Sequence, residues 1–383
     1  MKKILMIICL CLILTPLVTE AQSAVLAPES PSAILIEATT GSILYQKNIN
    51  ERKPPASMTK MIGMLIIAEE IEQGSLKLDE EIKISESAAA LGGSQIFLQP
   101  GEVMSVNDLF KAMAMASAND ATVALAERIA GTEEAFVKLM NERAKEMGLK
   151  NTNFKDSTGL DDGSYSTVKD MSIIALHLAK HDLVFKYTSK YEDHLRTDTE
   201  NKFWLVNTNK LVRFYEGMDG LKTGYTSASK YCLTATAKRD NMRLISVIMG
   251  APSIQVRNAE TTRMMDYGFN QYLITPIYSR GKELGKVRVP KAKDTTVTIV
   301  PKNDITVLSR KNNVPDKITH RLELDEIKPP VKKGETVGHV HVYADGKFLY
   351  KRAVTVEQDV EKATFLNLFT KSLRDTLTGN ISI

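Results

Sequence analysis

The sequence predicts a two-domain protein of the α/β (α+β) class, in which a mixed sheet flanked by helices precedes a small all-β domain. Three features of the 383-residue chain support this prediction: strand-like segments near both ends of the first 274 residues, helical periodicity between them, and short alternating strands afterwards. Strands at both ends of a helical block favour one sheet in which the two ends meet. The length also fits two domains, because single domains average about 100–200 residues.

Two predicted strand pairs would form that sheet. Residues 32–37 and 42–45 flank a turn at Gly41, which is typical of a β-hairpin. Residues 231–238 and 242–249 are also strand-like and are joined by a short polar turn. We therefore expect the beginning and the end of the first domain to lie side by side.

Helical patterns dominate the region between the two strand pairs. The first helix is expected to begin at Ser57 and to run through Glu70. A second begins at Ser105, where the sequence Ser-Val-Asn-Asp resembles a capping box. A third covers residues 121–130 and stops at Gly131, because glycine is favoured just after a helix.

Helix periodicity disappears after Ile274. Segments such as 287–289, 296–300 and 339–342 alternate between apolar and polar residues and are separated by turn-forming clusters. We therefore expect the first domain to cover residues 24–274 and an all-β domain to cover residues 275–357.

The last segment, residues 358–383, returns to helical spacing from Val360. Phe365 and Phe369 would lie on an apolar face, while Lys371 and Arg374 add positive charge. This pattern predicts an amphipathic helix that lies on a membrane surface and is too short and polar to span it. The alternative is a helix that packs against the β domain, since amphipathic helices commonly face a protein core.

The first 23 residues have the organisation of a signal peptide. Lys2 and Lys3 precede an apolar run, residues 4–18, and small residues at 21–23 form a cleavage site. The apolar run is short for a membrane span, which favours a cleaved signal peptide. The alternative is an N-terminal anchor that is not cleaved. The sequence therefore predicts an exported protein, at the outer face of the cytoplasmic membrane or in the cell wall space.

Composition and metal-ligand spacing exclude several classes. The net charge of +4, without a basic tract interleaved with aromatics, argues against nucleic-acid binding. Cys232 would be the one cysteine left after signal cleavage, so no internal disulfide is expected. His177 and His181 lack the glutamate of a zinc protease motif, and the pair at His339 and His341 provides only two ligands. We expect no metal and no cofactor.

The first chemical motif is Ser57-Met-Thr-Lys60. At the start of a helix, residues three apart lie on one face with about 5–6 Å between Cβ atoms, so Lys60 can reach the Ser57 hydroxyl. Serine needs a neighbouring base, and lysine becomes one when burial lowers its pKa. The motif is weak alone, because Ser-x-x-Lys recurs at Ser166, Ser227 and Ser279. The alternative is that Ser57 caps the helix while Lys60 points into water.

A second motif, Ser117-Ala-Asn119, lies between two predicted helices, where both side chains can point into a cleft. A similar sequence begins at Ser105, but that serine already serves as a helix cap.

The third motif, Lys222-Thr223-Gly224, occurs once and leads into a predicted strand. The lysine supplies charge, the threonine a hydroxyl donor, and the glycine leaves room for a substrate along the strand edge. The three motifs in this order form a signature of proteins that react with penicillin.

On these motifs, the sequence resembles the serine-type D-alanyl-D-alanine carboxypeptidases, the low-molecular-mass penicillin-binding proteins, and within them the sporulation-associated group of Gram-positive bacteria. The segments that carry the resemblance are residues 55–60, 93–97, 119–121, 157–160, 206–209 and 218–224. Two residues depart from the family pattern: Ala118, where glycine is commoner, and Tyr225 after the third motif. We expect them to tune substrate preference. The resemblance implies a penicillin-binding/β-lactamase-like transpeptidase domain.

The resemblance also implies a role for each motif residue. Ser57 would attack the carbonyl between two terminal D-alanines, and Lys60 would take its proton. Ser117 would help to move that proton to the leaving amine. Asn119 would bind the peptide amide and position Lys60.

The remaining implied roles concern substrate binding. Lys222 and Thr223 would meet the terminal carboxylate, with Arg257 as an additional cation. The backbone N–H groups of Ser57 and Tyr225 would form the oxyanion hole. Water would then hydrolyse the acyl-enzyme.

The predicted function is therefore removal of the terminal D-alanine from peptidoglycan stem peptides, with β-lactams as covalent inhibitors. One alternative is a β-lactamase, but the Glu-x-x-Leu-Asn-type loop of the class with a dedicated deacylating glutamate is not found. The other is a catalytically silent wall-binding homologue, although all three motifs are complete.

Overall fold

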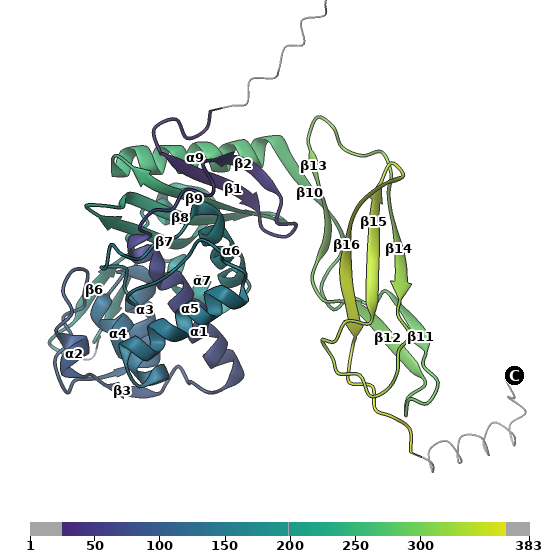
Figure 1. Ribbon diagram of the computed structural model, residues 1–383, viewed down its shortest axis with the longest axis horizontal. Coiled ribbons are helices and arrows are strands. Elements are labelled where there is room, and N and C mark those ends of the chain that lie inside the picture. The colour runs from purple at the N-terminus through teal and green to yellow at the C-terminus, as the bar shows by residue number, and fades with distance from the viewer. Residues whose placement is uncertain (1–24, 198, 365–383) are drawn as a thin grey trace, which may run out of the picture.

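The computed structural model describes residues 25–197 and 199–364, which form two bodies joined where helix α9 (Ile254–Gln271) leads into strand β10 (Tyr272–Tyr278) (Figure 1). The predicted signal peptide therefore lies outside the described residues. Among the helices that are described, none combines the length and apolar character needed to cross a bilayer.

A five-stranded sheet organises the first body. Its strands lie in the order β2-β1-β9-β8-β7. They are β1 (Ser32–Glu37), β2 (Ile43–Lys47), β7 (Met218–Thr226), β8 (Lys230–Arg239) and β9 (Met242–Ala251). The two expected hairpins are confirmed, and β1 pairs with β9, so the beginning and end of the domain meet.

The expectation of a mixed sheet was wrong, because every strand pairing in this sheet is antiparallel. A parallel pair needs a crossover connection, whereas strands joined by a short turn are antiparallel. Three of the four pairs in this sheet, β1–β2, β7–β8 and β8–β9, join strands that follow one another in the chain, and the remaining pair, β1–β9, is antiparallel as well.

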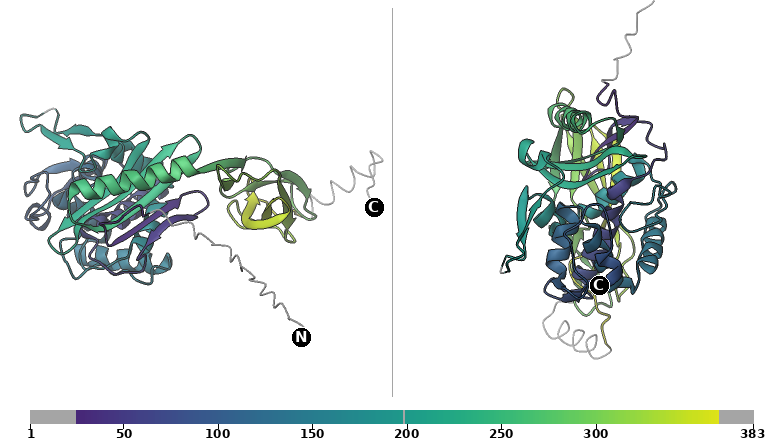
Figure 2. Two further views of the ribbon diagram at one scale, coloured as in Figure 1. Left: turned by 90° about the horizontal axis from the view of Figure 1, so that it is seen from above. Right: turned by 90° about the vertical axis from the view of Figure 1, so that its left-hand side faces the viewer.

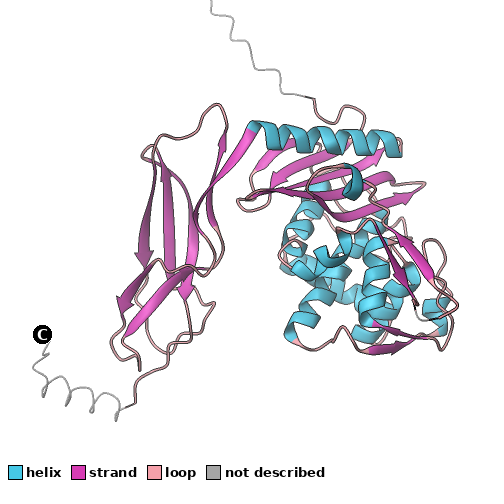
Figure 3. Ribbon diagram, turned by 180° about the vertical axis from the view of Figure 1, so that it is seen from behind, coloured by secondary structure: helices cyan, strands magenta, loops and turns pink. Residues whose placement is uncertain are grey.

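Both faces of the sheet are covered, as Figures 2 and 3 show, by α9 on one side and the helical block on the other. Alternate residues of β1 accordingly enter different cores: Ile34 and Ile36 pack toward the helical block, whereas Ala33 and Leu35 pack toward α9. This follows from the period of two along a strand. Cys232 on β8 is buried and is a free cysteine.

The helical block contains the segments predicted to be helical. Its main helices are α1 (Lys60–Gln73), α3 (Val106–Met115), α4 (Asn119–Ala130), α5 (Glu133–Glu146), α6 (Val168–Leu178) and α7 (Asp182–Thr188). Shorter elements are β3 (Glu81–Lys83), α2 (Glu86–Ala89), β4 (Val103–Ser105), β5 (Glu192–Leu195), β6 (Phe203–Val206) and α8 (Leu211–Phe214). Ser105 caps α3 by accepting a hydrogen bond from the Asp108 N–H at 3.1 Å, as predicted.

The second body is built of strands around a valine-rich core. One sheet has the order β11-β12-β16-β15-β14, and β10 pairs with β13. These strands are β11 (Gly285–Arg288), β12 (Thr296–Pro301), β13 (Ile305–Arg310), β14 (Ile318–Leu324), β15 (Gly338–Ala344) and β16 (Lys347–Val356).

The expected helix does not begin at residue 358. Through residue 364 the chain is not helical; Val360 pairs with Val331 and Lys362 with Ala292 as isolated β-bridges. The physical reason is that Val360, 6% exposed, belongs to the core of the β body. The predicted apolar face at Phe365 and beyond lies outside the described residues.

Candidate active site

Ser57 lies in a 3-10 turn, η1 (Ala56–Thr59), immediately before α1. It does not cap the helix, since the N-cap position is Thr59 and no side-chain cap bond is present. Lys60 is fully buried, and its Nζ lies 3.3 Å from Ser57 Oγ. Both parts of the alternative interpretation, a serine cap and a solvated lysine, were therefore wrong.

The environment of Lys60 suits a base. Its Nζ lies 2.7 Å from both Asn119 Oδ1 and the Thr158 carbonyl oxygen. Burial lowers the pKa of Lys60 to about 7, although the carboxylates of Asp156, Asp120 and Glu133 act in the opposite direction. Near neutral pH a substantial fraction of Lys60 is therefore uncharged and able to accept a proton.

Ser117 occupies the short link between α3 and α4. It is 3% exposed and has a positive φ of 64°. Its hydroxyl is buried and has no hydrogen-bond partner among the described protein atoms. The positive φ is uncommon for serine, and the unpaired hydroxyl is free to bond to a substrate or to water, so Ser117 suits a functional position.

Asn119, the first residue of α4, is held by hydrogen bonds to the loop that contains Gly92 and Ser94. Its Nδ2 donates to the Gly92 carbonyl and its backbone N–H to the Ser94 carbonyl, each at 2.7 Å. Gly93 lies against the same amide: a Cβ there would be 2.9 Å from Asn119 Nδ2. The side chain that positions Lys60 is thus itself fixed.

The segment from Asp156 to Leu160 packs against the turn η1, which contains Ser57. The Asp156 carboxylate accepts hydrogen bonds from the N–H groups of Gly159 at 3.0 Å and Leu160 at 2.7 Å. Gly159 has φ +82°, and a Cβ on it would lie only 1.9 Å from the Ala56 carbonyl oxygen. The close packing of this loop brings the Thr158 carbonyl to Lys60.

Strand β7 supplies the third motif. Lys222 is fully buried, with its Nζ 3.2 Å from the Thr223 carbonyl oxygen. Burial, together with the charges of Lys60 and Arg257, holds the pKa of Lys222 well below its usual range. The Thr223 hydroxyl is oriented by the Thr208 hydroxyl at 2.8 Å.

Gly224 allows β7 to approach the turn η1. A Cβ there would lie 2.8 Å from the Pro55 carbonyl oxygen and 3.3 Å from the Ser57 nitrogen. The next residue, Tyr225, is 53% exposed and stacks on Tyr231, with ring centroids 4.5 Å apart. The strand edge thus runs directly beside Ser57.

Arg257 projects from the first turn of α9 and is 5% exposed. Its Nε and Nη2 donate to Asn258 Oδ1 at 3.1 and 2.9 Å. Burial lowers the pKa of Arg257 to about 10, so it remains charged at neutral pH.

The structure thus joins Ser57, Lys60 and Asn119 directly, and it places Lys222 and Arg257 near enough to interact electrostatically. Sequence reasoning assigned no role to Thr158, Gly159 or Thr208, although all three lie in the segments that carry the resemblance.

The histidines considered as metal ligands do not form a site. His181 Nδ1 instead lies 2.8 Å from the Glu72 carboxylate. The described part of the chain has no grouping of three or more His, Cys, Asp or Glu side chains suited to a metal ion.

A buried lysine in contact with a serine hydroxyl, beside a strand edge that carries a second buried lysine, is an arrangement suited to a serine hydrolase that works by acyl transfer. The chain belongs to the D-alanyl-D-alanine carboxypeptidase family, peptidase family S11, whose model matches residues 18–253. Residues 272–362 match the model described as penicillin-binding protein 5, C-terminal domain.

Individual relatives agree with the family match. D-alanyl-D-alanine carboxypeptidase DacF of Bacillus subtilis is 47% identical, covering 91% of this chain and 90% of its own length. DacA of Escherichia coli is 32% identical, covering 88% of this chain and 85% of its own.

Solved structures show the same similarity. Penicillin binding protein 5 of Haemophilus influenzae superposes with a TM-score of 0.70 at 33% identity, covering 87% of this chain and 98% of that one. Penicillin-binding protein D2 of Listeria monocytogenes, in its ampicillin-bound form, gives a TM-score of 0.57 at 32% identity over 63% of this chain and 98% of that one. Apart from the mixed sheet, the expected fold class and the family are confirmed, and the chain is a serine-type D-Ala-D-Ala carboxypeptidase. The β-lactamase and silent-homologue alternatives are not favoured.

Proposed function

We propose that the chain removes the terminal D-alanine from peptidoglycan stem peptides through an acyl-enzyme on Ser57. The observation that carries this proposal is the buried Lys60 amine, 3.3 Å from Ser57 Oγ and with its pKa lowered to about 7. A neutral amine at that distance can take the serine proton as the hydroxyl attacks.

The proposed acylation proceeds in two transfers. Ser57 Oγ attacks the carbonyl carbon of the penultimate D-alanine while Lys60 accepts its proton. The proton then passes to the leaving amine, with the unsatisfied Ser117 hydroxyl as relay, and the C–N bond breaks. D-alanine departs, and water hydrolyses the ester, which frees Ser57. Asn119, held by Gly92 and Ser94, keeps Lys60 in place and receives the peptide amide.

The terminal carboxylate would bind at Lys222 and Thr223, with Arg257 behind them. In the free site, burial and neighbouring cations disfavour a charged Lys222; a bound carboxylate supplies the missing counter-charge and favours the ammonium form. Gly224 leaves the strand edge open, and the N–H groups of Ser57 and Tyr225 would stabilise the oxyanion.

The organisation of the chain is part of the proposal. Residues 1–23 would be the signal peptide, 24–274 the catalytic domain and 275–357 the all-β domain, with the tail attaching the exported enzyme to the membrane surface. The corrected path of residues 358–364 moves the start of any anchoring helix beyond Thr364. Family membership supports peptidoglycan as substrate and β-lactams as inhibitors. A role in sporulation is proposed on the sequence resemblance.

Release of D-alanine from a synthetic peptide ending in D-Ala-D-Ala tests the function. The signal-less wild-type chain should release D-alanine, and Ser57→Ala should release none. Turnover of benzylpenicillin is measured in parallel, because a wild-type chain that hydrolyses penicillin rapidly but releases no D-alanine would be a β-lactamase.

A further inference from the structure

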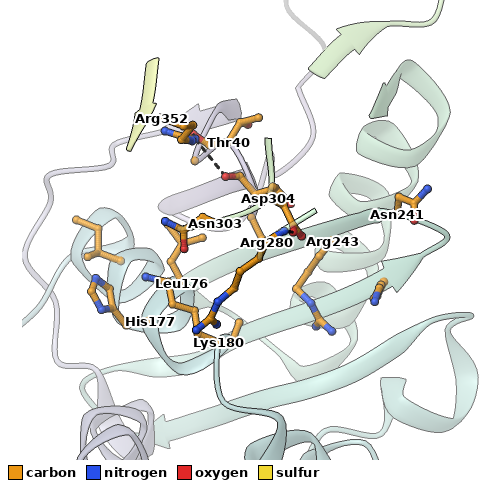
Figure 4. Close-up of a pocket in the computed structure, with 16 residues that line it drawn as sticks. Thr40, Leu176, His177, Lys180, Asn241, Arg243, Arg280, Asn303, Asp304 and Arg352 are labelled. Atoms are coloured by element: carbon orange, nitrogen blue, oxygen red, sulfur yellow. Dashed lines mark hydrogen bonds between the residues drawn. The ribbon is translucent and has the colours of Figure 1, made fainter. Parts of the chain in front are cut away.

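A cavity of about 500 Å³ lies between the two bodies, away from the site described above (Figure 4). The catalytic body contributes the β1–β2 turn, the end of α6 and the residues after it, and the end of β8 with the start of β9. The β body contributes Arg280, Asn303, Asp304 and Arg352. None of the nine predicted site residues lines this cavity. Its chemistry is therefore separate from acyl transfer.

Positive charge dominates the lining. The basic side chains are Lys180, Lys238, Arg243, Arg280 and Arg352, against one acidic side chain, Asp304.

Few of these charges are neutralised by the protein. Arg243 pairs with Asp219 at 2.8 Å, and Arg352 donates to the neutral carbonyls of Thr39 and Thr40 at 3.3 Å. Within the described residues, Lys180, Lys238 and Arg280 form no ion pair, although Lys238 lies near enough to Asp219 to interact with it electrostatically. Asp304 accepts a hydrogen bond from the backbone N–H of Arg280 at 2.7 Å. An excess of positive charge is therefore concentrated in the cavity.

His177 also lines the cavity. Burial is the main cause that lowers the pKa of His177, and Lys180, which lies in the same lining, lowers it further. A neighbouring anion favours the charged imidazole, so a ligand of negative charge in the cavity would raise this pKa.

We propose that this cavity binds an anion that carries phosphate groups. Its cations come from separate elements and from both bodies, so they can contact several oxygens of one multiply charged ligand, whereas a single carboxylate would engage fewer of them. The planar guanidinium groups of Arg280 and Arg352 match phosphate oxygens in a fork geometry, and Lys180 and Lys238 add point charges. The volume admits a pyrophosphate or a glycerophosphate unit.

Such a ligand would link the two bodies, because Arg280 and Arg352 belong to one and Lys180 and Lys238 to the other. Like charges held close together repel each other, and a bound anion removes that repulsion. Binding would thereby fix the orientation of the β body relative to the catalytic body.

Calorimetric titration of the signal-less chain with sodium pyrophosphate, at ionic strength balanced with chloride, tests the proposal. The double variant Lys180→Gln/Arg280→Gln should bind at least about tenfold more weakly, as expected from the loss of two charge-assisted contacts. The control Lys138→Gln/Lys145→Gln removes the same charge from the exposed face of α5 and should change affinity less than about twofold. Both variants should release D-alanine at the wild-type rate, which verifies their folding.

Two further measurements locate the anion and its source. The pKa of His177, followed by its imidazole resonance, should rise when pyrophosphate binds. Phosphatidylglycerol vesicles, compared with phosphatidylcholine vesicles, distinguish a lipid headgroup from a soluble phosphate, and a chain ending at Thr364 is used so that the tail does not contribute. Binding of pyrophosphate or of phosphatidylglycerol vesicles that the double variant reduces supports the phosphate site. Equal weakening in both double variants, or an unchanged His177 pKa, would overturn the proposal.

Discussion

At the scale of single residues, burial of Lys60 and Lys222 controls the chemistry. Both amines are fully buried, and both pKa values are lowered chiefly for that reason. In the proposed mechanism, Lys60 therefore acts as a base near neutral pH, and Lys222 would gain its full charge when a substrate carboxylate binds. The same residue type would perform two tasks because its neighbours differ.

The pKa of Lys60 leads to a prediction for the pH dependence of catalysis. Because only the neutral amine accepts the Ser57 proton, kcat/KM for D-alanine release should rise with pH through about 7. The rates are measured from about pH 5 to 9, since kcat/KM reports groups of the free enzyme. An acid limb centred far above neutrality would mean that Lys60 is not the base.

Lys222 should discriminate between substrates by their terminal group. Lys222→Ala removes a charge-assisted bond worth about 1.5–3 kcal/mol, so kcat/KM should fall steeply for a peptide with a free carboxylate. An analogue with a terminal amide should be affected much less. Equal losses for the two peptides would show that Lys222 does not contact the carboxylate.

The side chains of the site could be predicted from the sequence, but their backbone partners could not. The spacing of Ser57 and Lys60 on a helical turn brings them together locally, so the motif suffices. The carbonyl of Thr158 has no side-chain signature, and its contact with Lys60 depends on a loop 98 residues away. The positive φ of Ser117 could not be predicted either, because serine seldom adopts such a backbone conformation.

At the scale of elements, the loop at residues 156–160 and the turn η1 form one unit through Gly159. Gly159→Ala should be destabilising and should greatly reduce D-alanine release, because the new Cβ would lie 1.9 Å from the Ala56 carbonyl oxygen. Gly74→Ala is the matched control: its φ of +81° is similar, but nothing lies within 4 Å of an added Cβ. Thermal unfolding and kcat/KM are measured for both.

The free energy of unfolding of the control Gly74→Ala should fall only by the cost of placing alanine in the left-handed region, about 1–2 kcal/mol, and its activity should not change. Gly159→Ala should lose more stability and most of its activity, since the displaced loop carries the Thr158 carbonyl away from Lys60. Similar losses of stability and of kcat/KM in the two variants would show that the loop at residues 156–160 does not support the turn η1.

Local signals predicted elements well, and long-range pairing less well. The Ser105 cap and the Gly41 hairpin depend on neighbouring residues, and both are present. The orientation of strands in the sheet depends on the pairing of β1 with β9, more than 200 residues apart, so the expectation of a mixed sheet had no local information to correct it.

At the scale of the whole molecule, the path of the tail decides where the β body ends. The helical spacing from Val360 predicted a helix at a residue that instead pairs with Val331. Periodicity along the chain does not reveal such a contact. Asp359 likewise pairs with Lys332 at 2.8 Å. The residues up to 364 therefore belong to the packed body and not to an anchor.

Two truncations separate packing from anchoring. A chain ending at Thr364 should remain folded and active, whereas one ending at Gln358 should be destabilised by about 1.5–3 kcal/mol, because it loses the buried Val360 side chain. Only the full-length, signal-less chain should co-sediment with anionic vesicles, and salt should weaken that binding. A chain ending at Thr364 that sediments as well as the full-length one would place the membrane contact elsewhere.

The central claim, an acyl-enzyme on Ser57, is tested most directly by intact-protein mass spectrometry after reaction with benzylpenicillin, followed by peptide mapping. The wild-type chain should gain the mass of one penicillin, carried by the peptide that contains Ser57. Ser57→Ala should gain no penicillin mass. Its free energy of unfolding should lie within about 1 kcal/mol of the wild-type value, since Ser57 makes no capping bond. A label on Ser117 or on any other residue, or a label retained by Ser57→Ala, would contradict the account.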